Sequence, residues 1–394
     1  MPVSKPIRIA LVAGEDSGDQ LGAELIRSLQ RCAPMLEFAG IGGPQMRAAG
    51  CEVWYPHAAL AVMGLVEVLR HLPRLLKLRR QLRRRLRQWR PDLFIGIDAP
   101  DFNLRLERQL KAAGVKTLHY VSPSIWAWRE HRAASIGRSA DQVLCLLPME
   151  PAIYARYGVH AQFVGHPLAA CFALHPDAAA ARAQLGIARD ARVLALLPGS
   201  RLGEIARLAE PFIDAALRCR TAIPALIIIA PMASADGRRA FAAALARYPQ
   251  GQHIRLMDGN AQTAMIAADA VLVASGTAAL EAMLAKRPMV VGYRIAATSH
   301  WLVRTFGLLK SPSVSLPNIL AGRVIVPELL QQDCTGERLA AALLPLLTRA
   351  DIDPELLHCF EHLHQSLSAS DPDAAAHAVL ATLGRTAANA TTAP

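Results

Sequence analysis

The sequence predicts an α/β protein made of two doubly wound domains, each built on a parallel sheet. Short aliphatic runs alternate with amphipathic segments, which is the pattern of consecutive βα units. The alternation occurs once before residue 166 and again after residue 180. A chain of 394 residues also exceeds one ordinary domain and fits two of roughly 150 to 200 residues. These three observations favour two similar halves over one large domain.

Buried strands are expected wherever an aliphatic run ends in turn-forming residues. In the first half they are residues 7–13, 37–41, 93–97, 117–121, 142–147 and 162–165. In the second half they are residues 192–197, 225–230, 254–257, 270–274 and 289–292. Ligands of such sheets bind outside the carboxyl ends of the strands, where helix N-termini offer unpaired N–H groups. The residues that directly follow each strand are therefore the functional candidates.

The domain boundary is expected within residues 166–180, where two prolines and a run of alanines interrupt the pattern. We expect a first domain over 1–170, a second over 171–340, C-terminal helices over 341–386 and a disordered polar tail over 387–394. No apolar run approaches the roughly 18 residues of a spanning helix. The first apolar stretch suits a strand better than a secretory signal, so we expect a cytosolic protein. Seven scattered cysteines without a CxxC pair predict neither disulfides nor a zinc site.

"AGEDSGDQ" follows the first strand. Gly14 and Gly18 permit a tight turn, and Ser17 or Asp19 is placed to cap the next helix. Two acids in this loop would repel a pyrophosphate, which argues against a dinucleotide site. The alternatives are a plain capped helix and a polar loop facing a sugar acceptor, with Glu15, Ser17 and Asp19 on the acceptor side.

"GIDAPDFN" places Asp98 at the end of the next strand. Asp101 is expected to cap a helix starting near Phe102. Asp98 is not placed to cap a helix, and its apolar neighbours suit a general base. An aspartate that only forms a turn is equally consistent with the sequence. His119 is a reserve candidate to support Asp98.

Two tryptophans follow in "YVSPSIWAW". Trp126 and Trp128 are expected in a loop, where their rings either line a sugar pocket or pack between loops.

"LLPGSRLGE" combines a strand end, a glycine turn and a helix start. Ser200 and Arg201 add a hydroxyl and a fixed charge to the backbone donors, which suits a phosphate or diphosphate. A simple helix cap would use the same residues.

"ASGTAALEAM" repeats this arrangement. Ser275, Gly276 and Thr277 form a second group of donors at a helix start, and Glu281 lies one turn further on the same face. The apolar residues around Glu281 indicate a buried helix, where a carboxylate would accept the hydroxyls of a ribose. Two anion sites and a ribose acceptor predict a nucleoside diphosphate site in the second domain.

The strings "AGEDSGD", "AVMGLVEVL", "GIDAPDFN", "YVSPSIWAW", "LPGSR", "ASGTAALEAMLAKRPMVVGYR" and "SLPNILAGR" together resemble the lipid-A-disaccharide synthase family of Gram-negative bacteria. The resemblance covers residues 7–365. It implies an inverting glycosyltransferase of the GT-B fold, with two Rossmann-like domains facing a cleft.

In this family a 2,3-diacylglucosamine unit passes from its UDP conjugate to 2,3-diacylglucosamine 1-phosphate, giving a β(1→6) disaccharide 1-phosphate and UDP. By that resemblance Asp98 is the base, Ser200, Arg201 and residues 275–277 hold the diphosphate, Glu281 binds the ribose and Asn318 completes the donor side. No DxD pair occurs in the second domain, so we expect no metal or other cofactor.

Residues 63–89 predict a basic amphipathic helix. Ten Lys/Arg and no acid fall within residues 69–91, and residues 1–170 carry +9 of the net charge of +11. The expected core stripe is Leu65, Val68, Leu72, Leu75, Leu82, Leu86 and Trp89. The expected membrane contacts are Val66, Leu69, Leu76, Arg80 and Arg84. This pattern predicts peripheral docking on the anionic cytoplasmic face of the inner membrane.

Other functions are weaker. Nucleic-acid binding would require interleaved aromatics, and Trp89 is the only aromatic in residues 63–91. A UDP-sugar 2-epimerase would use the same frame but needs no acyl-binding surface. A non-catalytic lipid-trafficking protein would leave both anion sites without a purpose. The C-terminal helices are expected either to return to the first domain or to exchange with another chain in a homodimer.

Overall fold

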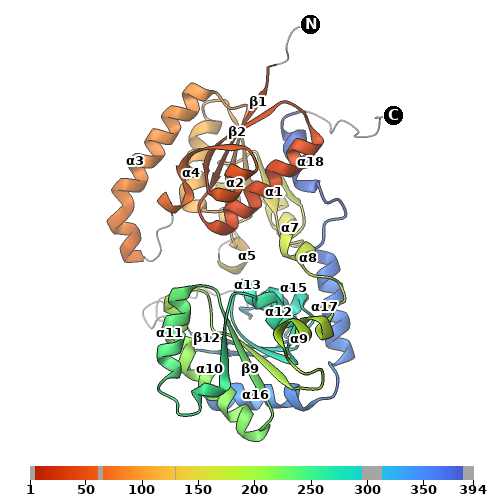
Figure 1. Ribbon diagram of the computed structural model, residues 1–394. Helices are drawn as coiled ribbons and strands as arrows, with labels where there is room; N and C mark the ends of the chain where they lie inside the picture. Colours follow the sequence, from red (N-terminus) through yellow and green to blue (C-terminus); the bar gives the residue numbers. More distant parts are fainter. Residues whose placement is uncertain (1–4, 61–64, 129, 295–312, 385–394) are drawn as a thin grey trace. The chain divides into compact units, whose positions relative to one another are not determined.

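The computed structural model describes residues 5–60, 65–128, 130–294 and 313–384, and for residues 65–72, 127 and 128 it describes the backbone alone. The chain divides into two compact units. Unit 1 contains residues 1–167 and 367–394, and unit 2 contains residues 168–366. Each unit is a parallel sheet with helices on its faces (Figure 1).

Unit 1 is built on a seven-stranded parallel sheet. The strands, in spatial order, are β3 (Cys51–Pro56), β2 (Leu36–Gly42), β1 (Ile7–Ala13), β4 (Leu93–Ile97), β5 (Lys116–Tyr120), β6 (Gln142–Cys145) and β7 (Ala161–Phe163). Its helices are α1 (Asp16–Cys32), α2 (Pro44–Ala48), α3 (Leu65–Trp89), α4 (Pro100–Lys111), α5 (Ile125–Trp128), α6 (Arg132–Gly137), α7 (Glu150–Ala155) and α18 (Ala374–Thr382). The order reverses direction between β1 and β4, as in doubly wound folds.

Alternating side chains of β1 explain the layers of unit 1. Ile9 and Leu11 pack in a core with residues of α1 and α18. Ala10 and Val12 point to the other face and pack with residues of α3 and α4. Successive side chains of a strand face opposite sides, so a strand covered on both faces must be apolar throughout.

Unit 2 repeats the scheme with a six-stranded parallel sheet. Its strands, in spatial order, are β10 (Ile254–Asp258), β9 (Ile227–Met232), β8 (Val193–Leu197), β11 (Ala270–Ala274), β12 (Met289–Tyr293) and β13 (Glu328–Leu330). Its helices are α8 (Pro167–Cys171), α9 (Ala178–Leu185), α10 (Leu202–Ala222), α11 (Ala235–Leu245), α12 (Ala261–Ala267), α13 (Thr277–Leu284), α15 (Leu316–Ala321), α16 (Gly336–Thr348) and α17 (Pro354–Leu367). Phe212 of α10 and Leu343 of α16 are fully buried in its core.

The C-terminal helices are shared between the units. Helices α16 and α17 belong to unit 2, whereas α18 packs against α1 in unit 1 (Figure 1). Asp373 at the start of α18 accepts hydrogen bonds from Ser28, at 2.5 Å, and Arg31, at 2.6 Å. The stretch 341–386, predicted as a segment of its own, therefore contributes to both units, and 387–394 lies outside the described residues.

The predicted strands are all present, but among the described residues two further strands, β3 and β13, were not predicted. Both β3 and β13 lie at an edge of their sheet, and most of their residues are only partly buried. An edge strand pairs on one side only and therefore needs no continuous apolar run. No strand was predicted after residues 289–292, so β13 at Glu328–Leu330 corrects that prediction.

Helix α3 has a buried stripe along its described part. Leu78, Leu82 and Leu86 recur at every fourth position and are at most 7% exposed. The predicted stripe contained Leu82 and Leu86 but not Leu78, while Leu75 is only partly buried. In the described part of the chain, none of the helices combines the length and apolarity needed to span a membrane.

Candidate functional site

A cavity of about 280 Å³ opens at the carboxyl ends of β8, β9 and β11 in unit 2. The strand ends Leu197, Met232 and Ala274 are among the residues that line it. Six of the seven residues predicted for the donor side line it: Ser200, Arg201, Ser275, Gly276, Thr277 and Glu281. The two turns that the sequence places 75 residues apart therefore meet at one site, because β8 and β11 are adjacent strands.

The turn between β8 and α10 exposes a helix N-terminus. Gly199 has a φ of 114°, and a Cβ there would lie 2.7 Å from Cβ of Glu204. Arg201 is the N-cap residue of α10, and its side chain makes no capping hydrogen bond. Its first backbone N–H groups are therefore available to an anion.

Glu204 was not predicted as a site residue. Its Oε1 accepts a hydrogen bond from Nη1 of Arg201 at 3.3 Å. The Arg201 side chain remains 58% exposed, whereas that of Glu204 is 12% exposed. Glu204 thus orients the guanidinium and leaves most of it accessible. An acid three residues after an arginine in a first helical turn was the signal available in the sequence.

The turn between β11 and α13 is also uncapped. Gly276 is the N-cap residue with a φ of 141°, and Thr277 is exposed. The Ser275 hydroxyl donates to the carbonyl of Val314 at 3.0 Å, so its proton is already used in a hydrogen bond within the protein. Glu281 is partly buried one turn along α13, and this burial raises the pKa of its carboxyl group. The cavity therefore combines two helix N-termini, one arginine and two carboxyl groups, those of Glu204 and Glu281, in a partly apolar setting.

Asn318, the seventh residue predicted for the donor side, is not among the residues that line this cavity. It is 1% exposed, and its Nδ2 donates to Val326 O at 2.9 Å and to Glu328 Oε1 at 2.7 Å. Its Oδ1 accepts from the N–H groups of Ile325 and Val326. These four bonds use the whole hydrogen-bonding capacity of the amide. Asn318 therefore holds residues 318–328 in place and has no group left for a nucleotide.

Asp98 stands at the carboxyl end of β4 in unit 1, in a strained bend. Asp98 and Ala99 have φ values of 50° and 44°, in the left-handed region that residues with a side chain rarely adopt. The Asp98 side chain is partly exposed. Backbone strain of this kind clusters at functional sites, which makes this bend a candidate.

The helix after this bend corrects one prediction. α4 begins at Pro100, with Ala99 as its N-cap residue, rather than near Phe102. Asp101 is an exposed residue of the first turn and caps nothing. Proline suits the first helical position, because its φ is fixed near the helical value and the N–H group that it lacks would have no partner within the helix.

The loop after β1 separates the predicted acceptor residues. Glu15 and Ser17 are exposed, and the helix starts at Asp16 without a side-chain cap, so the predicted capping by Ser17 or Asp19 is wrong. Asp19 is 1% exposed. Its carboxylate accepts the N–H groups of Gly43, at 2.6 Å, Gln45, at 2.9 Å, and Met46, at 3.1 Å. Asp19 therefore caps the N-terminus of α2.

Trp126 and His119 both pack against other residues of unit 1. Trp126 lies in the short helix α5, not in a loop, and packs against the cluster around Tyr154. The same helix contains Trp128, whose side chain is outside the described residues. His119 is fully buried, and its Nδ1 lies 2.7 Å from Oε1 of Glu107.

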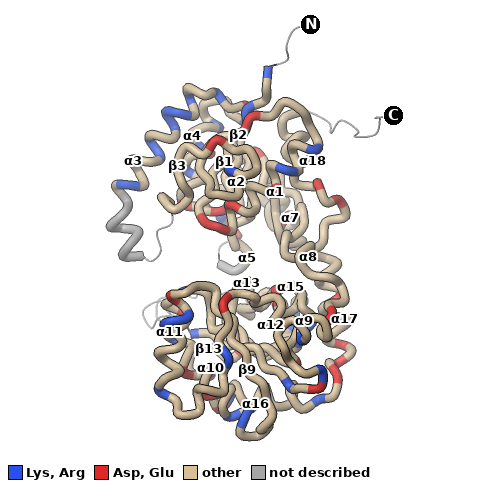
Figure 2. Tube along the Cα trace, in the orientation of Figure 1, with Lys and Arg blue, Asp and Glu red and all other residues tan. Residues whose placement is uncertain are grey.

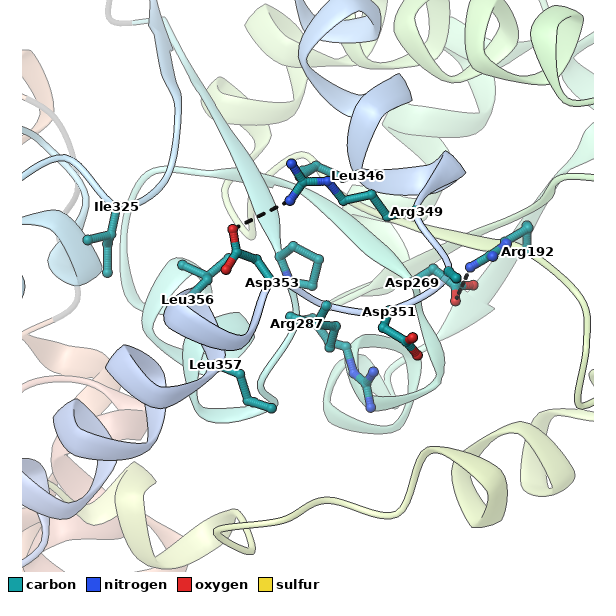
Figure 3. A pocket seen from close by; sticks show the side chains of 13 residues that line it. Arg192, Asp269, Arg287, Ile325, Leu346, Arg349, Asp351, Asp353, Leu356 and Leu357 are labelled. Atoms are coloured by element: carbon teal, nitrogen blue, oxygen red, sulfur yellow. Dashed lines mark hydrogen bonds and ion pairs between the residues drawn. The ribbon is translucent and has the colours of Figure 1, made fainter.

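A second cavity, of about 520 Å³, lies at the opposite edge of the unit 2 sheet. It is lined by residues that precede strands, such as Arg192, Asp269 and Pro288. Arg192 pairs with Asp269 at 3.3 Å and Arg349 with Asp353 at 3.5 Å (Figure 3). Ligands of parallel sheets bind at the carboxyl ends of the strands, so the smaller cavity is the functional candidate.

Comparison with known proteins decides the family. A family model described as lipid-A-disaccharide synthetase matches residues 9–379. The chain belongs to this family. The lipid-A-disaccharide synthase of Xanthomonas campestris pv. campestris is 55% identical over 373 residues, which are 94% of this chain and 85% of that protein. That of Pectobacterium atrosepticum is 52% identical over 377 residues, 96% of this chain and 98% of that protein.

Solved structures confirm the GT-B fold. The kitacinnamycin glycosyltransferase has a TM-score of 0.62 at 18% identity and covers 96% of this chain and 99% of its own. The calicheamicin glycosyltransferase CalG4 has a TM-score of 0.60 at 16% identity, with coverages of 97% and 100%. A putative UDP-N-acetylglucosamine 2-epimerase from Listeria monocytogenes has a TM-score of 0.57 at 13% identity, with coverages of 96% and 96%.

Transferases and epimerases therefore share this fold, and the fold does not choose between them. Membership of the lipid-A-disaccharide synthetase family does, because the relatives are synthases over nearly the whole chain. The predicted glycosyltransferase of lipid A synthesis is confirmed.

Proposed function

We propose that this glycosyltransferase moves 2,3-diacylglucosamine from its UDP conjugate to the 6-hydroxyl of 2,3-diacylglucosamine 1-phosphate. The acceptor oxygen forms a bond to C1 of the donor sugar, and the bond from C1 to the diphosphate breaks. The products are a β(1→6)-linked disaccharide 1-phosphate and UDP, and the hydroxyl proton passes to a base. The observation that carries this proposal is the convergence of two uncapped helix N-termini, Arg201 and Glu281 on one cavity.

In this proposal the unit 2 cavity holds UDP. The diphosphate gains negative charge as it leaves, and the N-termini of α10 and α13 together with Arg201 stabilise that charge. The partly buried Glu281 accepts hydrogen bonds from the ribose hydroxyls. A carboxyl group whose pKa is raised by burial gains most from such donors, because they replace the water that it has lost.

Asp98 is the proposed base for the acceptor hydroxyl. Asp98→Ala is expected to abolish turnover while UDP still binds, because UDP contacts the other unit of the chain. Asp101→Ala is the matched control, since Asp101 is an exposed carboxylate three residues away in α4. Titration calorimetry with UDP and an assay of UDP release read the two properties separately. Wild-type turnover in Asp98→Ala would remove Asp98 from the mechanism.

The acceptor side includes Glu15, Ser17 and Trp126 in this proposal. Glu15 and Ser17 are exposed directly after β1, so their polar groups are accessible to the hydroxyls of a sugar. Asp19 supports this loop by binding α2 and does not itself contact the acceptor.

The experiment that tests the reaction combines both diacylated sugars and measures UDP release together with product mass. The expected product is the disaccharide 1-phosphate. The donor alone should give no new sugar nucleotide, whereas an epimerase would make one. A new sugar nucleotide, or the absence of the disaccharide, would overturn the proposal.

Helix α3 is proposed to dock on the anionic cytoplasmic face of the inner membrane, where diacylated substrates reside. Figure 2 shows Lys and Arg recurring along α3. Arg80 and Arg84 are exposed, and Leu76 is partly buried, while the side chains of Val66 and Leu69 lie outside the described residues. Burial and the neighbouring Arg105, Arg80 and Arg83 lower the pKa of Arg79, so an anionic surface would relieve this crowding.

The docking proposal is tested with the Arg80→Gln/Arg84→Gln variant and vesicles of anionic or neutral lipid. Removing two cations is expected to weaken anionic-vesicle binding by about 2 kcal/mol, or roughly thirtyfold, at low salt. The variant Arg238→Gln/Arg239→Gln is the control, because both arginines lie on α11 of unit 2, where Arg239 is exposed and Arg238 is partly buried. Equal loss of binding in both variants, or binding that ignores salt, would contradict docking through α3.

A further inference from the structure

A fully buried polar cluster lies beneath the Asp98 bend. Asn103 and Glu107 project from α4, and His119 belongs to β5. All three are 0% exposed, and Nδ1 of His119 lies 2.7 Å from Oε1 of Glu107. Three polar side chains without solvent contact are unusual in the core of a sheet domain.

Gly96 makes room for this cluster. It lies in the middle of the unit 1 sheet, paired with His119 of β5. A Cβ on Gly96 would lie 2.2 Å from Glu107 Oε1 and 2.8 Å from Asn103 Cβ. Any side chain at this position would displace α4, so the cluster can pack against the sheet only because residue 96 is glycine.

The cluster holds the backbone on both sides of Asp98. Asn103 Nδ2 donates to the carbonyl of Asp98 at 2.8 Å. The same nitrogen lies 3.3 Å from Ile97 O and 3.2 Å from Val12 O. The N–H group of Asp98 donates to Tyr120 O at 2.8 Å, and Tyr120 follows His119. Both backbone polar groups of the strained residue are therefore bound.

The cluster also leaves three atoms unsatisfied. Asn103 Oδ1, Glu107 Oε2 and His119 Nε2 are buried without a hydrogen-bond partner in the described structure. Unpaired buried groups oppose folding, and an apolar core would avoid that cost. Features that oppose stability yet are built from several elements are expected at functional sites.

We infer that Asn103 is a positioning residue that fixes the left-handed bend of Asp98, and that the Glu107–His119 pair locks α4 against β5 so that Asn103 can do so. The inference rests on the proposed role of Asp98 as base. Asn103 and Glu107 lie one helical turn apart on α4, so one helix face reaches β1, β4 and β5 together. Without this clamp Asp98 would relax from the left-handed region and move its carboxylate.

The test compares Asn103→Ala, Asn103→Asp and Leu106→Ala. Leu106 is also 0% exposed on α4 and packs with apolar residues, so its variant reproduces a loss of packing without touching Asp98. Asn103→Asp keeps the shape of the side chain but not its donors. Both Asn103 variants are expected to lower kcat by roughly 10- to 100-fold, the effect of a small misplacement of a catalytic group. KM for the donor and UDP affinity should not change.

Leu106→Ala should lower the melting temperature and retain the wild-type kcat. Equal loss of kcat in Leu106→Ala and Asn103→Ala would overturn the inference, as would wild-type kcat in a folded Asn103→Ala. If Asn103→Ala does not fold, Asn103→Asp, which lacks the donors but keeps the shape of the side chain, is judged by the same criteria.

Two further variants separate the possible failures. Glu107→Ala should lower kcat, and Glu107→Gln, whose amide oxygen can accept from His119 Nδ1, should restore it. Equal activity of the two Glu107 variants would overturn the locking role of the pair. An active Asp98→Ala would instead defeat the proposed base. An inactive Asp98→Ala with an unaffected Asn103→Ala would defeat only the positioning role.

Discussion

The two units are both built on a parallel sheet, but they differ in which polar groups at the strand ends are already bound within the protein. In unit 2, the turns after β8 and β11 leave two helix N-termini uncapped around a cavity of about 280 Å³. In unit 1, Asp19 fills the N-terminus of α2 and Asn103 binds the carbonyls at the ends of β1 and β4. A Cβ on Gly14 would lie 2.7 Å from Cβ of Ala99, so the loop after β1 and the loop after β4 are in contact.

This difference follows from what each unit is proposed to bind. A diphosphate carries its own negative charge and completes the hydrogen bonding of open helix ends. A sugar hydroxyl carries no charge, and in unit 1 the side chains of Asp19 and Asn103 bind the N-terminus of α2 and the carbonyls next to Asp98 instead of leaving them to a ligand. Substitutions of Arg201, Glu150, Gly199 and Ser275 test this difference between the units.

The largest effect is expected at Arg201 in the open site of unit 2. Arg201→Ala should lower kcat roughly 10²- to 10³-fold and weaken UDP binding, because a fixed charge facing the leaving group is lost. Arg218→Ala is the control, since Arg218 lies on the same helix and pairs with Asp214 at 3.0 Å. Steady-state kinetics and UDP calorimetry measure both. An Arg201→Ala enzyme no weaker than the control would place the diphosphate elsewhere.

The next effect concerns a closed strand end in unit 1. Glu150 follows β6, is 3% exposed and has a pKa raised by burial to about 7. The folded state therefore holds this proton more tightly than the unfolded state, whose value is 4.5. The stability from Glu150 is present below that value and is lost as pH rises through about 7.

This loss amounts to up to about 3 kcal/mol. Urea unfolding at about pH 5 and about pH 8 should show it in the wild type and much less of it in Glu150→Gln. An unchanged pH slope in the variant would assign the dependence to other groups.

A smaller effect is expected from Gly199→Ala at the mouth of the unit 2 cavity. The new Cβ would lie 2.7 Å from Cβ of Glu204, at a φ of 114°. Strain and displacement of Glu204 should cost about 2 kcal/mol and weaken UDP binding. Gly186→Ala is the control. Gly186 also has a positive φ, of 64°, but a Cβ there would have no atom within 4 Å, so this variant should lose only about 1 kcal/mol of stability. Thermal unfolding with and without UDP distinguishes the two.

The smallest effect is expected from Ser275→Ala. The variant loses the hydrogen bond to Val314 O at 3.0 Å, worth about 1 kcal/mol of stability. UDP affinity should change little, because the α13 N–H groups remain. A large fall in UDP affinity would show that the hydroxyl contacts the nucleotide directly.

Local sequence was enough to predict most of the unit 2 site. The glycine turns, Arg201 and Glu281 lie within a few residues of a strand end, so strand periodicity placed them at one edge of the sheet. Sequence was not enough for Asn318 and Asp19, whose partners lie 7 to 10 and 24 to 27 residues away, respectively. Asp19 was placed on the acceptor side because a polar residue near a strand end looks the same whether it faces a ligand or a backbone. Asn318 was assigned to the donor side by the family resemblance alone.

The sequence by itself determined the alternation of strands and helices, the family motifs and the residues that follow each strand, because these depend on periodicity and local turn chemistry. Only the tertiary structure decided which of those residues remain open to a ligand. It placed Asp19, Asn103, Asn318 and the Glu107–His119 pair inside the protein, where each binds a group distant in sequence. Hydrogen-bond partners are chosen by proximity in space, and a linear pattern does not contain that distance.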